Sequence, residues 1–139
     1  MKQSKLLKIF TDGASRGNPG PAACAFILLE NDKIILESSE FIDNATNNIA
    51  EYQAIINALT TAEKYTDRPV QVYSDSNLAV QQINKKWKVN YPHLARLRDE
   101  VYLLCKNFKG VEFIHVGRNN PYIQRCDEIC NAELDAHLI

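Results

Sequence analysis

The sequence predicts a single α/β domain in which helices pack on a mixed β-sheet. Three strand-like segments come first, and helix-like and strand-like segments alternate from Asn47 onward, an order typical of this class. The chain has 139 residues, enough to bury one core without disulfides or metal ions, so we expect one domain over residues 1–139.

The first half of the chain predicts three strands and a helix. The strands are apolar segments at residues 6–11, 24–30 and 33–41. Asn31-Asp32 is a two-residue turn signal, so the second and third strands should form an antiparallel hairpin. Candidate inward-facing residues of the third strand are Ile34, Leu36 and Phe41. The helix carries one apolar stripe, made of Tyr52, Ile55, Ile56, Leu59 and Ala62.

The second half predicts two strands and three helices. The segments are a strand at 70–74, a short helix at 77–83, a long helix with an apolar seam from Leu94 to Phe108, a strand at 111–116 and a final helix from near Gln124. The complete order is strand–strand–strand–helix–strand–helix–helix–strand–helix, which indicates a five-stranded mixed sheet flanked by helices.

The composition is that of an ordinary globular protein. The formal net charge of −1 gives no global signature of nucleic-acid binding. No apolar run approaches the roughly 20 residues that cross a bilayer, and the basic residues 1–5 do not open a signal peptide. We therefore expect a cytoplasmic protein without membrane contact. The cysteines lack zinc-ligand spacing and are expected to be buried, reduced thiols: Cys24, Cys105, Cys126 and Cys130.

Four acidic residues occupy unusual positions: Asp12, Glu51, Asp75 and Asp127. Asp12 and Asp75 each follow a predicted strand, and these two strands should be parallel neighbours that end at the same edge of the sheet. Glu51 and Asp127 are expected on the inward faces of their helices, where an unpaired charge is costly. Clustered carboxylates repel one another unless cations neutralise them, and oxygen ligands favour Mg²⁺ or Mn²⁺ over zinc.

Taken singly, each acid has a simpler explanation. Asp75 could cap the helix that follows it, and Asp12 could be a turn residue before the glycines and prolines of residues 13–21. Four acids at strand ends and inward helix faces together favour a metal site.

Four motifs resemble the type 1 ribonuclease H family, in that family's order and spacing over nearly the whole chain. They are residues 12–20 (DGASRGNPG), 46–52 (TNNIAEY), 73–76 (YSDS) and 125–127 (RCD). The resemblance implies the ribonuclease H-like fold and an endonuclease that hydrolyses the RNA strand of RNA–DNA hybrids, leaving 5′-phosphate and 3′-hydroxyl ends. It also implies that Asp12, Glu51, Asp75 and Asp127 are catalytic ligands of two Mg²⁺ ions, with Mn²⁺ as a substitute.

The resemblance further implies contacts to the substrate. Five residues match positions that line the family's substrate groove: Gly13, Ser15, Asn18, Asn47 and Asn48. Asparagine amides and glycine backbone can contact a ribose 2′-hydroxyl, the group that distinguishes RNA from DNA. Asn77 matches a polar RNA contact, and Thr46 matches a contact to a DNA phosphate.

Two positions depart from the family pattern. Bacterial members carry a histidine in the loop after the last strand, where this chain has Arg118, as archaeal-like members do; His115 belongs to the strand. A guanidinium can contact phosphate but cannot shuttle protons near neutral pH. Ile123 stands where the family usually has Asn, so one hydrogen bond that fixes the loop is expected to be missing.

The connection between the short and the long helix is basic and lacks the long protrusion of some bacterial members. Lys85, Lys86, Trp87 and Lys88 are candidate contacts to the DNA strand. The alternative is a solvated connector in which Trp87 packs on the long helix.

Two other functions are open at this point: a catalytically inactive hybrid-binding module and another nuclease of the same superfold. A complete set of four acids argues against the first, since a binder gains nothing from clustered like charges. Asn47-Asn48 and the glycine-rich turn argue against the second. We expect a monomer that binds an RNA–DNA hybrid and has no obligate protein partner.

Overall fold

The computed structural model describes residues 6–138, so the basic segment at residues 1–5 lies outside the described part. The elements in chain order are β1 (Leu7–Ser15), β2 (Gly20–Glu30), β3 (Lys33–Ala45), α1 (Asn47–Ala62), β4 (Val70–Ser74), α2 (Asn77–Ile83), α3 (Pro92–Cys105), β5 (Val111–His115) and α4 (Pro121–His137). This is the predicted order of strands and helices.

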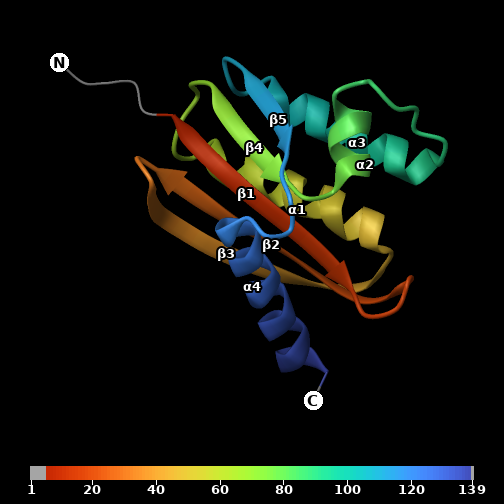
Figure 1. Ribbon diagram of the computed structural model, residues 1–139. Coiled ribbons are helices and arrows are strands. Elements are labelled where there is room, and N and C mark those ends of the chain that lie inside the picture. Colours follow the sequence, from red (N-terminus) through yellow and green to blue (C-terminus); the bar gives the residue numbers. More distant parts are fainter. Residues whose placement is uncertain (1–5, 139) are drawn as a thin grey trace.

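The strands form one five-stranded sheet in the order β3-β2-β1-β4-β5, with β1 at its centre (Figure 1). β1 pairs with β2 and β2 with β3 in antiparallel fashion, whereas β4 is parallel to both β1 and β5. The predicted mixed sheet is therefore confirmed. It places the ends of β1 and β4 side by side.

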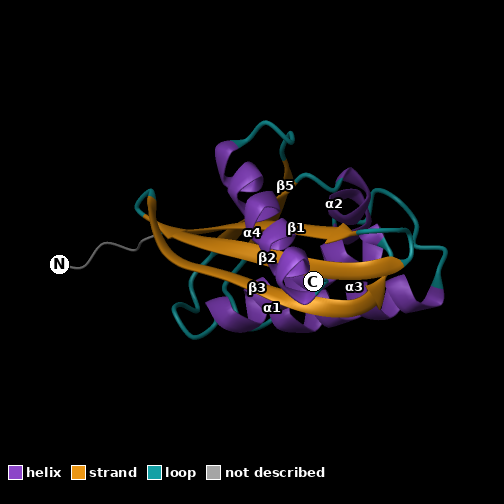
Figure 2. Ribbon diagram, turned by 90° about the horizontal axis from the view of Figure 1, so that it is seen from below, coloured by secondary structure: helices purple, strands orange, loops and turns teal. Residues whose placement is uncertain are grey.

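Helices cover both faces of this sheet. On one face, α1, α2 and α3 enclose the larger core, in which Ile9, Val72 and Leu59 are completely buried. On the other face, α4 packs on β1, β2 and β3 through a smaller core that includes Ile27, Cys126 and Cys130. Figure 2 shows α1 and α4 on opposite sides of the strands. No helix within residues 6–138 is long and apolar enough to cross a membrane.

Local sequence explains several element boundaries. Asn31 and Asp32 both have positive φ angles, 53° and 63°, as the predicted two-residue hairpin turn requires. Side-chain oxygens cap α1 and α2: Thr46 accepts from Ile49 N at the start of α1, and Ser76 accepts from Ala79 N at the start of α2. Ser76 rather than Asp75 is thus the cap of α2, and the capping explanation for Asp75 is wrong.

The structure corrects four expectations about the sheet and α4. β1 continues to Ser15 instead of ending at residue 11, so Asp12 lies within the strand. Ile34 follows the hairpin turn on the edge strand and is 46% exposed. Phe41 stacks on His137 of α4 with ring centroids 4.1 Å apart, because side chains alternate between faces and odd-numbered residues of β3 face α4. Finally, α4 begins at Pro121, earlier than the predicted Gln124.

Candidate active site

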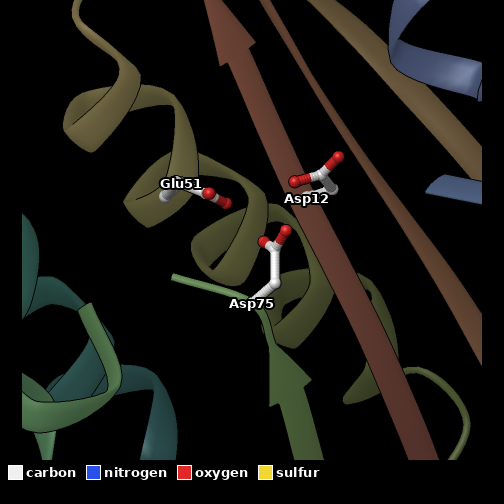
Figure 3. A group of neighbouring side chains, drawn as sticks. All are labelled: Asp12, Glu51 and Asp75. Carbon is white, nitrogen blue, oxygen red and sulfur yellow. The ribbon is translucent and has the colours of Figure 1, made fainter. Parts of the chain in front are cut away.

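Asp12 and Asp75 meet because β1 and β4 are parallel neighbours. The last paired residues are Thr11 and Ser74, so the next residue of each chain segment is an aspartate. Asp12, Glu51 and Asp75 each place a carboxylate oxygen within 4.8 Å of the other two (Figure 3). Their predicted clustering is confirmed. The three acids come from separate elements, β1, α1 and the end of β4.

Glu51 reaches the cluster because α1 lies unusually close to β1. The backbone N–H of Gly13 donates a hydrogen bond of 3.0 Å to Glu51 Oε1. A Cβ atom on Gly13 would lie 2.3 Å from the carbonyl carbon of Ala50, which is far inside van der Waals contact. Glycine at this position therefore permits the approach that brings Glu51 beside Asp12.

The cluster strongly disfavours negative charge in the absence of cations. Burial, followed by the charges of Asp75 and Asp127, raises the pKa of Asp12 from 3.8 to about 8. Burial and the charges of Asp12 and Asp75 also raise the pKa of Glu51 well above its usual value, while the Gly13 N–H and Arg118 act in the opposite direction. A bound cation would offset this repulsion and stabilise the ionised form of both carboxyl groups.

The chemistry of the donors fits a hard divalent cation. Asp75 Oδ1 is buried and has no hydrogen-bond partner among the described residues, so one acceptor in the cluster is unsatisfied. The three clustered side chains offer only oxygen ligands, as Mg²⁺ and Mn²⁺ prefer. Arg118 Nε lies 3.9 Å from Asp75 Oδ2. The Arg118 side chain is 94% exposed, so its guanidinium can move away from the cluster when a metal ion binds.

Asp127 lies at the rim of the same site instead of on the inward face of α4. The buried stripe of α4 consists of Ile123, Cys126, Cys130 and Leu134, and Asp127 falls at the edge of this stripe and is exposed. Cys126 Sγ donates to Phe10 O and Cys130 Sγ donates to Asp12 O, which holds this part of α4 against β1. Asp127 still lines the pocket of about 460 Å³ that contains the three clustered acids.

The glycine-rich turn and the start of α1 hold each other by reciprocal hydrogen bonds. Ser15 N donates to Asn47 Oδ1 at 2.9 Å, and Asn47 N donates to Asn18 Oδ1 at 3.0 Å. The Ser15 hydroxyl donates to Ala45 O at 2.8 Å. The residues that were predicted to contact substrate thus also hold the glycine-rich turn against the start of α1. Because both Asn oxygens accept backbone N–H groups, the two NH₂ groups remain for other acceptors.

The other predicted substrate residues are less uniform in position. Asn48 lines the pocket together with Asn47 and Gly13. Thr46 caps α1 through its hydroxyl oxygen. Asn77 is exposed and lies outside the pocket lining, and its Oδ1 accepts from Gln81 Nε2 at 3.1 Å.

In the basic connection, Trp87 is 47% exposed, so the alternative in which this residue packs on the long helix can hold at most in part. Lys86 and Lys88 are exposed as well. Lys85 Nζ lies 5.4 Å above the centre of the Tyr102 ring, a cation–π geometry.

Sequence reasoning missed some residues of the site. Ala14, Ser76 and Gln124 also line the pocket. Ile123, which stands where the family usually has Asn, lines it as well. Gln124 lies one helical turn before Asp127, so helical spacing could have found it. Asn120 caps α4 by accepting from both Tyr122 N and Ile123 N. These two hydrogen bonds fix the start of α4 at Ile123, the position where the usual Asn is absent.

Comparison with known proteins supports one class. The sequence profile of the Reverse transcriptase-like family matches residues 10–126. Ribonuclease HI of Halobacterium salinarum is 39% identical over 127 residues, covering 91% of this chain and 63% of that protein. Ribonuclease H of Thermoanaerobacter pseudethanolicus is 39% identical over 144 residues, covering 93% of this chain and 90% of that protein.

Solved structures agree with these sequence relatives. The crystal structure of RNase H1 from Halobacterium salinarum superposes with a TM-score of 0.89 at 37% identity, over 94% of this chain and 98% of that chain. The structure of LC11-RNase H1 in complex with RNA/DNA hybrid superposes with a TM-score of 0.90 at 32% identity, over 96% of this chain and 99% of that chain. The fold and its acidic site thus define a ribonuclease H-like protein. The chain belongs to the type 1 ribonuclease H family.

Some relatives are considerably longer. The chain spans 63% of the Halobacterium ribonuclease HI and 35% of the bifunctional protein of Mycobacterium tuberculosis, to which it is 36% identical.

Proposed function

We propose that this protein is a metal-dependent endonuclease that hydrolyses the RNA strand of RNA–DNA hybrids, leaving 5′-phosphate and 3′-hydroxyl ends. The observation that carries the proposal is the cluster of Asp12, Glu51 and Asp75 in a pocket that Asp127 also lines. Membership of the ribonuclease H family supports it. So does the hybrid bound by LC11-RNase H1, the relative with the TM-score of 0.90.

In this proposal the four acids hold two divalent cations. Bound cations would activate a water molecule for attack on the phosphodiester and stabilise the leaving 3′-oxygen. Asp75, with its unsatisfied Oδ1, and Asp12, with its raised pKa, are the acids that cation binding satisfies most directly. Arg118, largely exposed beside Asp75, contacts a substrate phosphate and does not transfer protons.

The glycine-rich turn and the start of α1 select the RNA strand in this proposal. The NH₂ groups of Asn18 and Asn47 donate to ribose hydroxyls or base edges, because their oxygens already accept backbone N–H groups. Asn48 contributes from the pocket wall, and Thr46, Asn77 and the basic residues 85–88 contact the hybrid further out. In this proposal, residues 85–88 bind the DNA strand.

We further propose that Mg²⁺ is the physiological ion, that Mn²⁺ substitutes for it, and that the protein acts as a cytoplasmic monomer. Oxygen ligands support the choice of ion. The described chain forms one continuous sheet, and its cysteines are free thiols, as a reducing compartment favours.

The test is cleavage of labelled duplexes by purified protein in Mg²⁺ or Mn²⁺. An RNA–DNA hybrid should be cut in its RNA strand, whereas double-stranded DNA should stay intact. Asp12→Asn and Asp75→Asn should reduce cleavage to background while retaining the folded circular-dichroism spectrum. Asp43→Asn, which changes an exposed carboxylate on β3, is the matched control and should cleave like the unaltered protein.

Hybrid binding without cleavage in either metal would identify a binding module instead. Cleavage of duplex DNA would identify a different nuclease of this fold. Either result rejects the proposed function.

A further inference from the structure

A buried polar pair connects α1 to the basic connection at residues 85–88. The Tyr52 hydroxyl of α1 donates a hydrogen bond of 2.6 Å to Gln82 Oε1 of α2. Both side chains are inaccessible, at 0% and 4% exposed. Gln82 Nε2 in turn donates to Lys88 O at 3.2 Å. One glutamine thus links the helix that carries Glu51 to the far end of the 85–88 connection.

A second tyrosine holds the near end of the same connection. The Tyr102 hydroxyl of α3 donates to Ile83 O at 2.7 Å, at the last residue of α2. Lys85 stands over the Tyr102 ring, and its φ of 64° reverses the chain. The backbone N–H groups of Lys86 and Trp87 both donate to Gln81 O, at 2.8 and 3.2 Å. The 85–88 connection is therefore fixed in shape although it is exposed.

The fixed connection displays chemistry suited to a nucleic-acid backbone. Lys86 and Lys88 are exposed, and Trp87 presents a half-exposed ring between them. Lysines neutralise phosphates, and an exposed aromatic ring packs on sugars or bases. In Figures 1 and 2 the connection between α2 and α3 lies on the same side of the molecule as the carboxyl end of β1. Residues 85–88 do not line the acidic pocket, so they would meet the hybrid away from the phosphate that is cut.

A buried hydrogen-bonded pair is not needed for core stability as such. Apolar side chains of similar size at both positions can be equally stabilising, because a hydrogen bond inside the protein largely replaces hydrogen bonds to water. The pair does fix geometry, since Gln82 satisfies both ends of its amide only when Tyr52 and Lys88 occupy their present positions.

We propose that Tyr52 and Gln82 are positioning residues that hold the 85–88 connection in the shape that binds the DNA strand of the hybrid. This inference rests on the proposed function. Preorganisation strengthens binding because residues 85–88 lose little conformational freedom when the strand arrives.

The first experiment measures steady-state hybrid cleavage by Tyr52→Phe, which removes one hydroxyl from the core. KM should rise about threefold to tenfold, as expected for loss of one buried hydrogen bond, while kcat changes less than about twofold. Gln82→Met should raise KM in the same way, and it replaces Tyr52→Phe in the experiment if that variant folds poorly. Asn57→Ala is the matched control, because it removes side-chain bonds from α1 to Cys24 and Glu40, away from this connection. Its KM should not change.

The second experiment repeats Tyr52→Phe in a protein that also carries Lys86→Ala and Lys88→Ala. If the tyrosine acts through these lysines, the rise in KM should largely disappear in this background, and the salt dependence of KM should already be flattened. An equal rise in both backgrounds, a fall in kcat in place of the rise in KM, or an unchanged KM would each overturn the proposal.

Failure of the positioning role is distinguishable from failure of the proposed function. If the unaltered protein does not cleave the hybrid, the proposed function is rejected, and this inference is rejected with it. If the unaltered protein cleaves and the variants show no coupling, only the positioning role is rejected.

Discussion

Replacement of Asp12 by Asn should stabilise the metal-free protein, and more so at pH 8 than at pH 5. Burial and the charges of Asp75 and Asp127 raise the pKa of Asp12 to about 8 in the folded protein, from its usual value of 3.8. Between these values the folded state keeps a proton that the unfolded state has released. Stability of the unaltered protein therefore falls as pH rises through this window. Asparagine has no proton to lose.

The size of this effect follows from the pKa difference. Each pKa unit corresponds to about 1.4 kcal/mol, so the Asp12 contribution to the free energy of unfolding should fall by on the order of 2–4 kcal/mol between pH 5 and pH 8. The burial-raised pKa of Glu51 adds to the loss in the same direction. Because the Asp12 charge also contributes to the shift of Glu51, Asp12→Asn should relieve part of that cost too.

The assay is urea unfolding in EDTA at several pH values from 5 to 8, followed by circular dichroism. Asp43→Asn controls for the loss of one negative charge at an exposed site. Mg²⁺ at about 100 times its Kd should add about 2.7 kcal/mol to the unaltered protein at pH 8, and less to Asp12→Asn. Equal pH slopes for the unaltered protein and Asp12→Asn, or a rise in stability from pH 5 to pH 8 without metal, would refute this reasoning.

Three further predictions concern glycine, a helix cap and the arginine. Gly13→Ala should destabilise the fold by about 3 kcal/mol or more, because its Cβ would lie 2.3 Å from Ala50 C, whereas Gly110→Ala, with 4.0 Å to its nearest neighbour, should change urea stability little. Asn120→Ala should cost about 1–2 kcal/mol of stability by removing the cap of α4, and an unchanged midpoint would show that the cap is dispensable. Arg118→Ala should lower kcat/KM for hybrid cleavage by removing a contact to a substrate phosphate, and an unchanged kcat/KM would reject that contact.

The order of elements could be predicted from the sequence because apolar periodicity records which face each segment buries. The stripe from Tyr52 to Ala62 is buried as predicted, and the turn at Asn31-Asp32 forms the expected hairpin. Strand ends were harder to predict. Glycine and small polar residues after Asp12 look like a turn, yet pairing with β2 extends β1 to Ser15.

The acidic cluster could be predicted because strand ends and helix faces are local properties of the sequence. Asp127 was placed wrongly because one residue along a helix is enough to turn a side chain from the core to the rim. The bond between Tyr52 and Gln82 could not be foreseen, because the two residues are 30 positions apart and only the packing of α1 on α2 brings them together. The same holds for the contact between Gly13 and Glu51.

The unequal lengths of β1 and β4 have a consequence for how much insertion the chain tolerates. β4 stops at Ser74, while β1 continues from Asp12 to Ser15. This stretch of β1 pairs with β2 but has no strand on its other side, and α1 closes against it at Gly13. The acidic site therefore occupies a step in the sheet. Extra residues after Ser74 would fill the step or displace Asp75, whereas extra residues between Asn31 and Asp32 would lengthen a hairpin at the opposite end of the sheet. A tag or fused domain belongs at that hairpin.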